Sequence, residues 1–333
     1  MQNNNMSAVA EFTLLGFQAS QNIRIIMFLL LLVVYCVTIS MNLLIITLVS
    51  SNRNLHNPMY FFISQLFIND ILLTTDISPN TLHILLNNGA TITFIGCIAQ
   101  LYFFSASEAS ECLILTVMSY DRYVAICNPL RYTSLMTSTY CVKLAIASWM
   151  VGFFIMLITI ITTSVQNFCG PNFIDHFFCD LVPLLEISCS DTYSVQMEVS
   201  LLSIPLVFIP IIIIIFSYTR IIITTLRIRS STGRQKAFST CSSHLIVVSI
   251  FYWTMFSVYV FPKKGETLSI NKSLSLLYTV FTPLINPIIY SLKNNDIKRA
   301  LHVQVNSWVR CLLPGHHSAI VLRHSKAQVP QDS

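Results

Sequence analysis

The sequence predicts an all-α membrane protein, a seven-transmembrane helix bundle with its N-terminus outside and its C-terminus inside. Two observations predict this class. Hydrophobic residues make up 54% of the chain and charged residues only 10%, whereas a soluble domain carries roughly 25% charged residues. Apolar runs of about 17–25 residues, the length that crosses a bilayer, recur along the sequence. The composition therefore excludes an ordinary water-soluble domain.

The first apolar run, Ile25 to Val49, is predicted to be an uncleaved spanning helix. It contains no charged residue, and the preceding residues 1–23 contain no Lys or Arg. A secretory signal has a basic start and an apolar core of only about 7–15 residues. The run is too long for that core, so we expect it to remain in the membrane.

Seven spans are expected, at about 23–49, 58–84, 94–122, 141–164, 196–226, 237–261 and 272–291. They divide the chain into an extracellular N-terminal segment (1–22), a seven-transmembrane domain (23–291) and a cytoplasmic amphipathic helix and tail (292–333). The connection 165–195 is the one long polar loop. Ile211–Ile215 is β-branched but is predicted to be helical, because a backbone in lipid must satisfy its own hydrogen bonds. The odd number of spans argues against two equal inverted repeats.

The orientation follows from the basic residues, which concentrate at cytoplasmic ends of spans. One set of ends holds Arg53, Arg122, Arg131, Lys143, Arg220, Arg227, Arg229, Arg234 and Lys236. The opposite loops hold mainly Lys263, Lys264 and Lys272, with most of the acidic loop residues. The N-terminus is therefore predicted to be external. The glycosylation acceptor Asn5-Met6-Ser7 lies on that side and agrees.

Four of the ten cysteines map to the outer side: Cys97, Cys169, Cys179 and Cys189. An even number of cysteines in an oxidising compartment favours disulfides. Four cysteines allow three pairings, and their spacing alone does not choose among them. The stretch His176–Asp180 also has the residue types of a metal site, but a cysteine in a disulfide offers no thiolate ligand.

Polar residues interrupt several spans. Asp70 and Asn42 lie deep in the second and first spans, and an intramembrane carboxylate marks a functional site by default. The third span ends in Met118–Cys127, which includes Asp121 and Arg122. Taken alone, Asp121 and Arg122 could equally form an ion pair without a function, with the arginine side chain extending to the membrane–water interface. The seventh span ends in Pro283–Tyr290, where a proline removes a helix hydrogen bond and Asn286 offers a compensating partner.

These segments together resemble the rhodopsin-like G-protein-coupled receptors, and longer motifs narrow the resemblance to vertebrate odorant receptors. The motifs are Leu14–Phe17, Pro58–Phe62, Asp121–Tyr123 with Asn128–Tyr132, Ser217–Tyr218, and Lys236–His244, and the resemblance covers roughly residues 10–302. It implies a receptor that binds a small volatile odorant and activates a stimulatory, olfactory-type heterotrimeric G protein, raising cyclic AMP. The implied location is the plasma membrane, in olfactory sensory neuron cilia.

The resemblance also implies the site residues. The ligand pocket is expected in the outer half of the bundle, lined by Phe104, Ser105, Glu108, Cys112, Leu202, Ser203, Leu206, Tyr252, Met255, Phe256, Tyr259 and Thr279. Residues implied in G-protein coupling and activation are Asp121, Arg122, Tyr123, Tyr218, Arg234, Lys236, Asn286, Pro287 and Tyr290. For any one pocket residue, simple helix packing is nearly as good an explanation; for the group it is not.

Further implied features are two disulfides, Cys97–Cys179 and Cys169–Cys189, and a sodium ion between Asp70 and Glu111. No other cofactor is expected. Residues 291–309 are predicted to form an amphipathic helix along the inner membrane surface, with Ile297, Leu301, Val305 and Trp308 toward lipid. Cys311 is a candidate palmitoylation site.

Some features depart from the family pattern. Trp253 stands where the family usually has glycine, and we expect its indole beside the pocket floor. The tail after about residue 310 is longer than usual and has no assigned role. Glu108 is not a family hallmark either. It is interpreted either as a protonated acid that donates a hydrogen bond or as a carboxylate that favours amine-bearing odorants.

Three rival functions fit the sequence less well than an odorant receptor does. A transporter or channel would need a continuous polar path, whereas the outer halves of the spans are mostly apolar. A peptide or lipid receptor of the same fold fits the short N-terminal segment and the motifs less well. No nucleophile–base pair supports an enzyme, and no nucleic-acid partner is expected.

Overall fold

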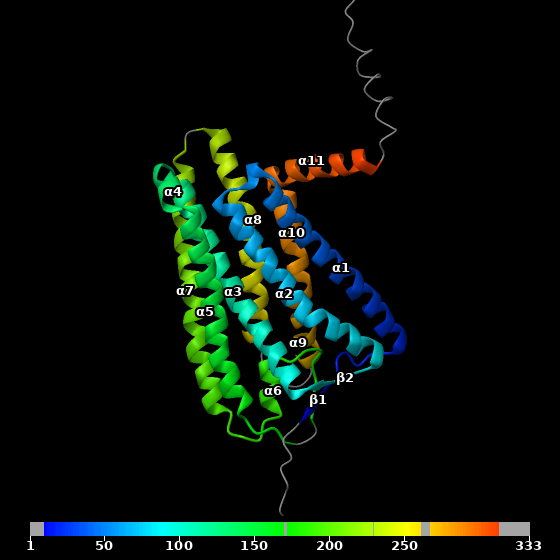
Figure 1. Cartoon of the computed structure of the whole chain (residues 1–333). Helices are drawn as coiled ribbons and strands as arrows, with labels where there is room; N and C mark the ends of the chain where they lie inside the picture. The colour runs from blue at the N-terminus through cyan, green and yellow to red at the C-terminus, as the bar shows by residue number, and fades with distance from the viewer. Residues whose placement is uncertain (1–9, 170–171, 229, 261–266, 313–333) are drawn as a thin grey trace, which may run out of the picture.

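In the computed structural model, long helices form a bundle with a small β-sheet at one end (Figure 1). The structure describes residues 10–169, 172–228, 230–260 and 267–312. Its long helices are α1 (Gln21–Ser51), α2 (Pro58–Asn87), α3 (Phe94–Cys127), α5 (Ser138–Ser164), α7 (Tyr193–Leu226) and α8 (Ser231–Val260). The last bundle element is continuous: α9 (Thr267–Leu276), a π-helical turn η2 (Leu277–Phe281) and α10 (Thr282–Lys293).

All seven predicted spans correspond to helical segments, and their starts show why. Pro58 occupies the first turn of α2, where its missing N–H leaves no bond unmade, and the Asn57 side chain accepts from the Tyr60 amide at 3.3 Å. Thr93 and Thr137 cap α3 and α5 in the same way. The isoleucine run 211–215 lies within α7 and is helical, as expected for a backbone in lipid.

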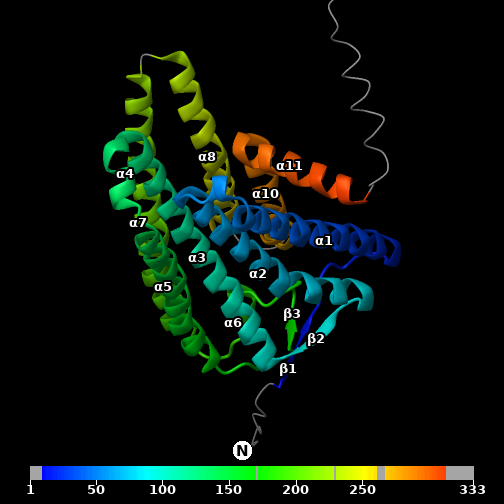
Figure 2. The ribbon, with the colours of Figure 1, turned by 45° about the horizontal axis from the view of Figure 1, so that its top comes forward.

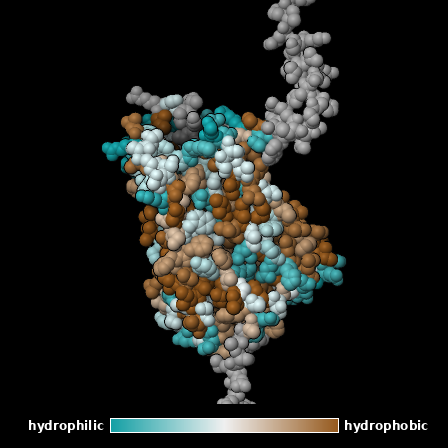
Figure 3. All heavy atoms as spheres, in the orientation of Figure 1, coloured by the Kyte–Doolittle hydropathy of each residue, from teal (hydrophilic) through white to brown (hydrophobic). Residues whose placement is uncertain are grey.

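Five helical segments of the described chain are long and apolar enough to cross a membrane: α1, α3, α5, α7 and Lys272–Lys293. α2 is long but carries Asn69, Asp70 and Thr74, which are buried in the bundle and lower its mean hydropathy. In α8 the apolar stretch is Cys241–Ser257. Apolar side chains gather across the middle of the face shown in Figure 3, so the chain is a multi-pass helical membrane protein.

A three-stranded sheet covers one end of the bundle. Its strand order is β2 (Ala90–Thr93), β1 (Glu11–Leu14), β3 (Phe173–Ile174); β1 is antiparallel to β2 and parallel to β3. A short helix, α6 (Leu181–Glu186), lies at the same end (Figure 2). The sheet joins the N-terminal segment to two loops that are distant in sequence, so this end of the bundle is a single packed unit.

Gly16, directly after β1, lies where no other residue fits well. Its φ is +62°, in the left-handed region, and a Cβ there would overlap the Ile84 side chain. Its amide donates to the His176 carbonyl at 3.0 Å. The glycine therefore lets the N-terminal segment lie directly against α2 and the long loop.

The opposite end carries short elements: η1 (Arg53–Leu55), α4 (Pro129–Leu135) and α11 (Asn295–Leu312). α11 runs across the end of the bundle (Figure 1), in agreement with the predicted helix at 291–309. One detail of that prediction is wrong. Ile297 is 0% exposed and belongs to the main hydrophobic core, so it packs against the bundle and not toward lipid. The side chains of Val305 and Trp308 lie outside the described residues.

Candidate functional site

Three of the predicted pocket residues meet in the bundle interior. The thiol of Cys112 on α3 lies 3.2 Å from the Tyr252 hydroxyl on α8 and 3.4 Å from the carbonyl of Leu206 on α7. All three residues are buried. The cluster links three helices through one sulfur, one hydroxyl and a carbonyl freed near Pro210, within an otherwise apolar lining.

Aromatic rings close the bundle above this cluster. Phe177 and Phe178, from the loop after β3, are fully buried. Phe178 packs edge-on against Phe104 of α3, with ring centroids 5.0 Å apart, and Phe104 contacts Tyr278 of η2. Phe17 stacks on Phe177. We call the three-stranded sheet, the N-terminal residues up to Phe17 and the described loop residues between α5 and α7 (165–169 and 172–192) the outer cap, and the opposite end of the bundle the inner end, after the orientation that the sequence predicts.

A lysine ties three parts of the outer cap together. Lys272, at the start of the last span, forms an ion pair with Asp175 of the long loop and donates to the Gly16 carbonyl at 2.9 Å. The Lys272 side chain is only 8% exposed, whereas that of Asp175 is 39% exposed. Sequence analysis placed Lys272 among the external basic residues but missed this role, because its partners are 97 and 256 residues away.

The outer cap also contains two disulfides. Cys97 pairs with Cys179 and Cys169 pairs with Cys189, with Cα–Cα distances of 5.4 and 5.8 Å. These are the two pairs that the family resemblance implied. The first fixes the start of α3 to the aromatic residues of the outer cap, and the second closes the base of the long loop.

A polar centre lies deeper in the bundle, around Asp70 on α2 and Glu111 on α3. Asn286 of α10 donates to both carboxylate oxygens of Asp70, at 3.1 and 3.2 Å. Asn69 donates to Glu111 at 3.2 Å. Among the described residues, three buried oxygens there have no hydrogen-bond partner: Glu111 Oε1, Asn69 Oδ1 and Asn286 Oδ1. Unpaired buried acceptors next to two carboxyl groups suit a cation or a shared proton.

The polar centre includes the proline-containing stretch of α10. Asn42 of α1 donates to the Pro283 carbonyl at 3.2 Å, which replaces a hydrogen bond that the helix loses near Pro287. The first span, the second span and α10 are therefore joined by side-chain amides. The sequence had singled out Asn42, Asp70 and Asn286, and the structure brings all three to one region.

At the inner end, Arg122 of α3 lies 3.8 Å from Asp121, and both are buried. Tyr132 of α4 donates to Asp121 at 2.9 Å. Next to them, the Tyr218 hydroxyl of α7 lies 2.6 Å from Nδ1 of His244 on α8. Tyr123, Pro287 and Tyr290 lie in the same half of the bundle; Arg234 is exposed at the start of α8, and the Lys236 side chain lies outside the described residues.

Comparison with known proteins agrees with this geometry. The family described as "Olfactory receptor" matches residues 31–306 of the chain. Olfactory receptor 10A7 of Homo sapiens is 44% identical over 89% of this chain and 94% of its own length. Olfactory receptor 5G26 of Mus musculus is 45% identical over 90% of this chain and 95% of its own length. The chain belongs to the olfactory receptor family. This is a family of G-protein-coupled receptors and not of enzymes.

The receptor assembles some of the expected pocket residues and not others. Phe104, Cys112, Leu206, Tyr252 and Thr279 are buried in the bundle. Ser105, Glu108, Leu202, Ser203 and Met255 are partly buried. Phe256 is 42% exposed and faces away from the bundle interior. Asn5, the side chain of Tyr259 and the side chain of Cys311 lie outside the described residues.

Trp253 corrects one expectation for the receptor. The indole was expected beside the pocket floor, but Trp253 is 73% exposed and lies on the face of α8 that points away from the bundle. Tyr252 and Thr254, the residues on either side, are buried instead. At this level of α8, the side chains that turn into the bundle are therefore those of the neighbours of Trp253.

A further contact at the inner end of the receptor was missed from the sequence. The Tyr60 hydroxyl of α2 donates to Asn294 and Asp296, both at 3.1 Å, where α10 ends and α11 begins. Tyr60 lies in the Pro58–Phe62 motif that supported the family resemblance, so the motif marked Tyr60 as a residue of interest. The sequence could not identify its hydrogen-bond partners, because they lie 234 and 236 residues away.

Proposed function

We propose that this receptor binds a small volatile odorant in the outer half of the bundle and activates a stimulatory, olfactory-type G protein that raises cyclic AMP. The contact of Cys112 with Tyr252 and Leu206 is the main support. It joins α3, α7 and α8 directly beneath the outer cap. A molecule bound there would touch the helices whose relative position must change in signalling.

Signalling follows from a two-state equilibrium in which the odorant binds one arrangement of the helices better. The Tyr218–His244 and Arg122–Asp121 contacts hold α7, α8, α3 and α4 in the described arrangement. When the inner half of α8 moves outward, Arg122 becomes accessible to the G protein. Arg227 and Arg234, both at the inner ends of their helices, add positive charge to that face.

The proposed topology has seven spans, an external N-terminus and an internal C-terminus, in the plasma membrane. α2 serves as a span although its mean hydropathy is low, because its polar residues Asn69, Asp70 and Thr74 turn into the bundle and not toward lipid. α8 serves as the sixth span through Cys241–Ser257. The two disulfides then lie in the oxidising compartment, as disulfides require.

We also propose a sodium ion at the polar centre. Asp70 and Glu111 would hold it, with the Asn286 side-chain oxygen, which has no hydrogen-bond partner among the described residues, as a further ligand. The ion would neutralise two carboxylates that otherwise repel each other in a low-dielectric interior. Replacing external sodium by choline should then shift the agonist dose–response curve, and Asp70→Asn should remove that shift.

The test of the function is a screen of chemically diverse odorants on cells that express the receptor, with cyclic AMP as the readout. An active odorant should lose potency in Tyr252→Phe, which removes only the hydroxyl next to Cys112. Phe154→Leu, on the exposed face of α5, is the matched control and should respond as the wild type. Odorant-gated ion flux without cyclic AMP would contradict the proposal and favour a channel.

A further inference from the structure

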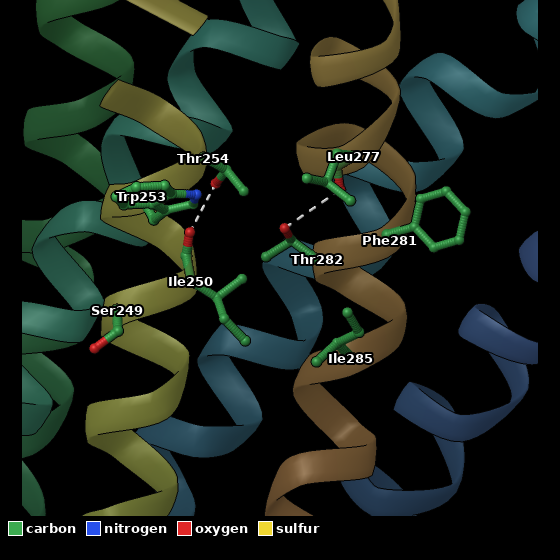
Figure 4. Close-up of a pocket in the computed structure, with 8 residues that line it drawn as sticks. All are labelled: Ser249, Ile250, Trp253, Thr254, Leu277, Phe281, Thr282 and Ile285. Atoms are coloured by element: carbon green, nitrogen blue, oxygen red, sulfur yellow. Dashed lines mark hydrogen bonds between the residues drawn. The ribbon is translucent and has the colours of Figure 1, made fainter. Parts of the chain in front are cut away.

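A groove lies between α8 and the last span, on the exposed side surface of the bundle. It encloses a volume of about 420 Å³ and is lined by Ser249, Ile250, Trp253, Thr254, Leu277, Phe281, Thr282 and Ile285 (Figure 4). Trp253 and Leu277 are exposed, so the groove is continuous with the bilayer-facing surface of the bundle. It is separate from the proposed odorant site, which lies on the other side of Tyr252 and Thr254.

The walls of the groove are apolar, and its hydroxyl groups are already used. Thr254 donates to the Ile250 carbonyl at 2.9 Å, and Ser249 donates to the Leu245 carbonyl at 2.7 Å. Thr282 donates to the Leu277 carbonyl, across the π-helical turn. These hydroxyls therefore need no partner from a bound molecule.

The indole N–H of Trp253 is different. It donates no hydrogen bond to any other described residue, and Trp253 is 73% exposed. Trp253 lies four residues before the end of the apolar stretch Cys241–Ser257 of α8, which corresponds to about 6 Å of helix. The indole therefore lies just inside the edge of the hydrocarbon, where a donor without an acceptor is unfavourable. The groove thus has one unmatched donor at its outer end and an apolar body that extends inward.

The last span is irregular where it forms the groove. Leu277 and Phe281 are the two ends of the π-helical turn η2. A π-turn places one extra residue in a helical turn, and such turns occur frequently at functional sites. In Figure 4, Leu277, Thr282 and Ile285 point toward α8, while Ile250 and Thr254 point back toward α10.

We propose that this groove is a binding site for a membrane sterol. The sterol hydroxyl accepts from the Trp253 indole, and the flat ring system runs inward against Ile250 and Ile285. The surface that contains the groove faces lipid, so its occupant comes from the membrane. A phospholipid chain is disfavoured because a flexible chain loses conformational entropy when it is ordered in a groove, whereas a rigid ring system is already ordered.

The test uses the full-length receptor in cell membranes and a photoreactive, clickable sterol. After irradiation, the receptor is purified and digested, and the labelled peptides are identified by mass spectrometry. We expect adducts in residues 249–254 and 277–285. Excess unlabelled sterol should compete, whereas phospholipid should not. Competition by phospholipid alone would overturn the sterol assignment, and competition by an activating odorant alone would make the groove part of the odorant site.

Two substitutions separate the hydrogen bond from the aromatic surface. Trp253→Phe keeps a ring but removes the donor, and labelling should fall by about 2- to 12-fold, as for the loss of one neutral hydrogen bond. Trp253→Leu should lower it further. Phe154→Leu on the exposed face of α5 is the matched control and should leave labelling unchanged.

Unchanged labelling in Trp253→Leu, or labelling spread over the exposed faces of α1, α5 and α7, would overturn the proposal. Surface expression of each variant is measured in parallel. If Trp253→Leu does not reach the membrane, Ile250→Trp replaces it, because that change fills the groove and should abolish labelling. The labelling readout does not involve the G protein, so it tests the sterol site independently of the proposed signalling function.

Discussion

The ion pair between Lys272 and Asp175 gives a prediction in which the two partners behave differently. Lys272→Met removes the ammonium but keeps most of the side chain's length. It leaves the Gly16 carbonyl without its donor at 2.9 Å, while Asp175, 39% exposed, regains water. A hydrogen bond to a charged group contributes about 1.5–3 kcal/mol, and the exposure of Asp175 lowers its share. We expect a loss of about 1–3 kcal/mol.

Asp175→Asn should be more harmful than Lys272→Met. It leaves an ammonium that is only 8% exposed without its counter-charge, and breaking a buried pair by removing one partner costs about 3–5 kcal/mol. Solvent near the partly exposed partner reduces that figure, so the expected loss lies toward its lower end. The double variant should be close to Lys272→Met, because it removes the charge that Asp175→Asn leaves unpaired.

The assay is the thermal stability of the purified receptor in detergent, followed by the loss of its monodisperse gel-filtration peak. Lys272→Met should lower the midpoint by on the order of 5 °C, and Asp175→Asn by more. Lys143→Met, at an exposed position of α5, is the control and should change little. If the two single losses simply add in the double variant, or if Asp175→Asn is harmless, the proposed coupling is wrong.

Three further predictions concern signalling and the outer side. Arg122→Ala should abolish the cyclic AMP response while surface expression stays measurable; a response of wild-type strength would refute its role. Peptide mapping under non-reducing conditions should recover Cys97 linked to Cys179, and a link from Cys97 to Cys169 would contradict the structure. Glu108→Gln keeps size and a donor but cannot ionise, so responses to amines should collapse and those to neutral oxygenates should survive. Unchanged amine dose–response curves would exclude an ionised Glu108.

Several features followed from local properties of the sequence. Long apolar runs must be helical in lipid, so the positions of the long helices were predictable to within a few residues at most ends. Polar residues inside those runs marked the polar centre, because Asn42, Asp70 and Asn286 are unfavourable in hydrocarbon unless they find partners. The family motifs identified the class of receptor and the disulfide pairs.

The inward and outward faces of the spans were harder to predict. In a soluble helix the polar face identifies the solvent side, but lipid is as apolar as the bundle interior, so this contrast is weak. Trp253 and Phe256 were both expected at the pocket, and both are exposed. Ile297 was expected toward lipid, and it is buried against the bundle. Each error concerns the direction in which an apolar side chain points.

The sequence by itself thus determined the class of protein, its helices and the residue types of its polar centre, because these depend on composition and local periodicity. Only the tertiary structure decided which distant segments meet. The Lys272 contacts, the bond from Tyr60 to the start of α11 and the groove beside Trp253 all join residues separated by tens to hundreds of positions. Such pairs are selected by the packing of whole helices and loops, and no local pattern encodes them.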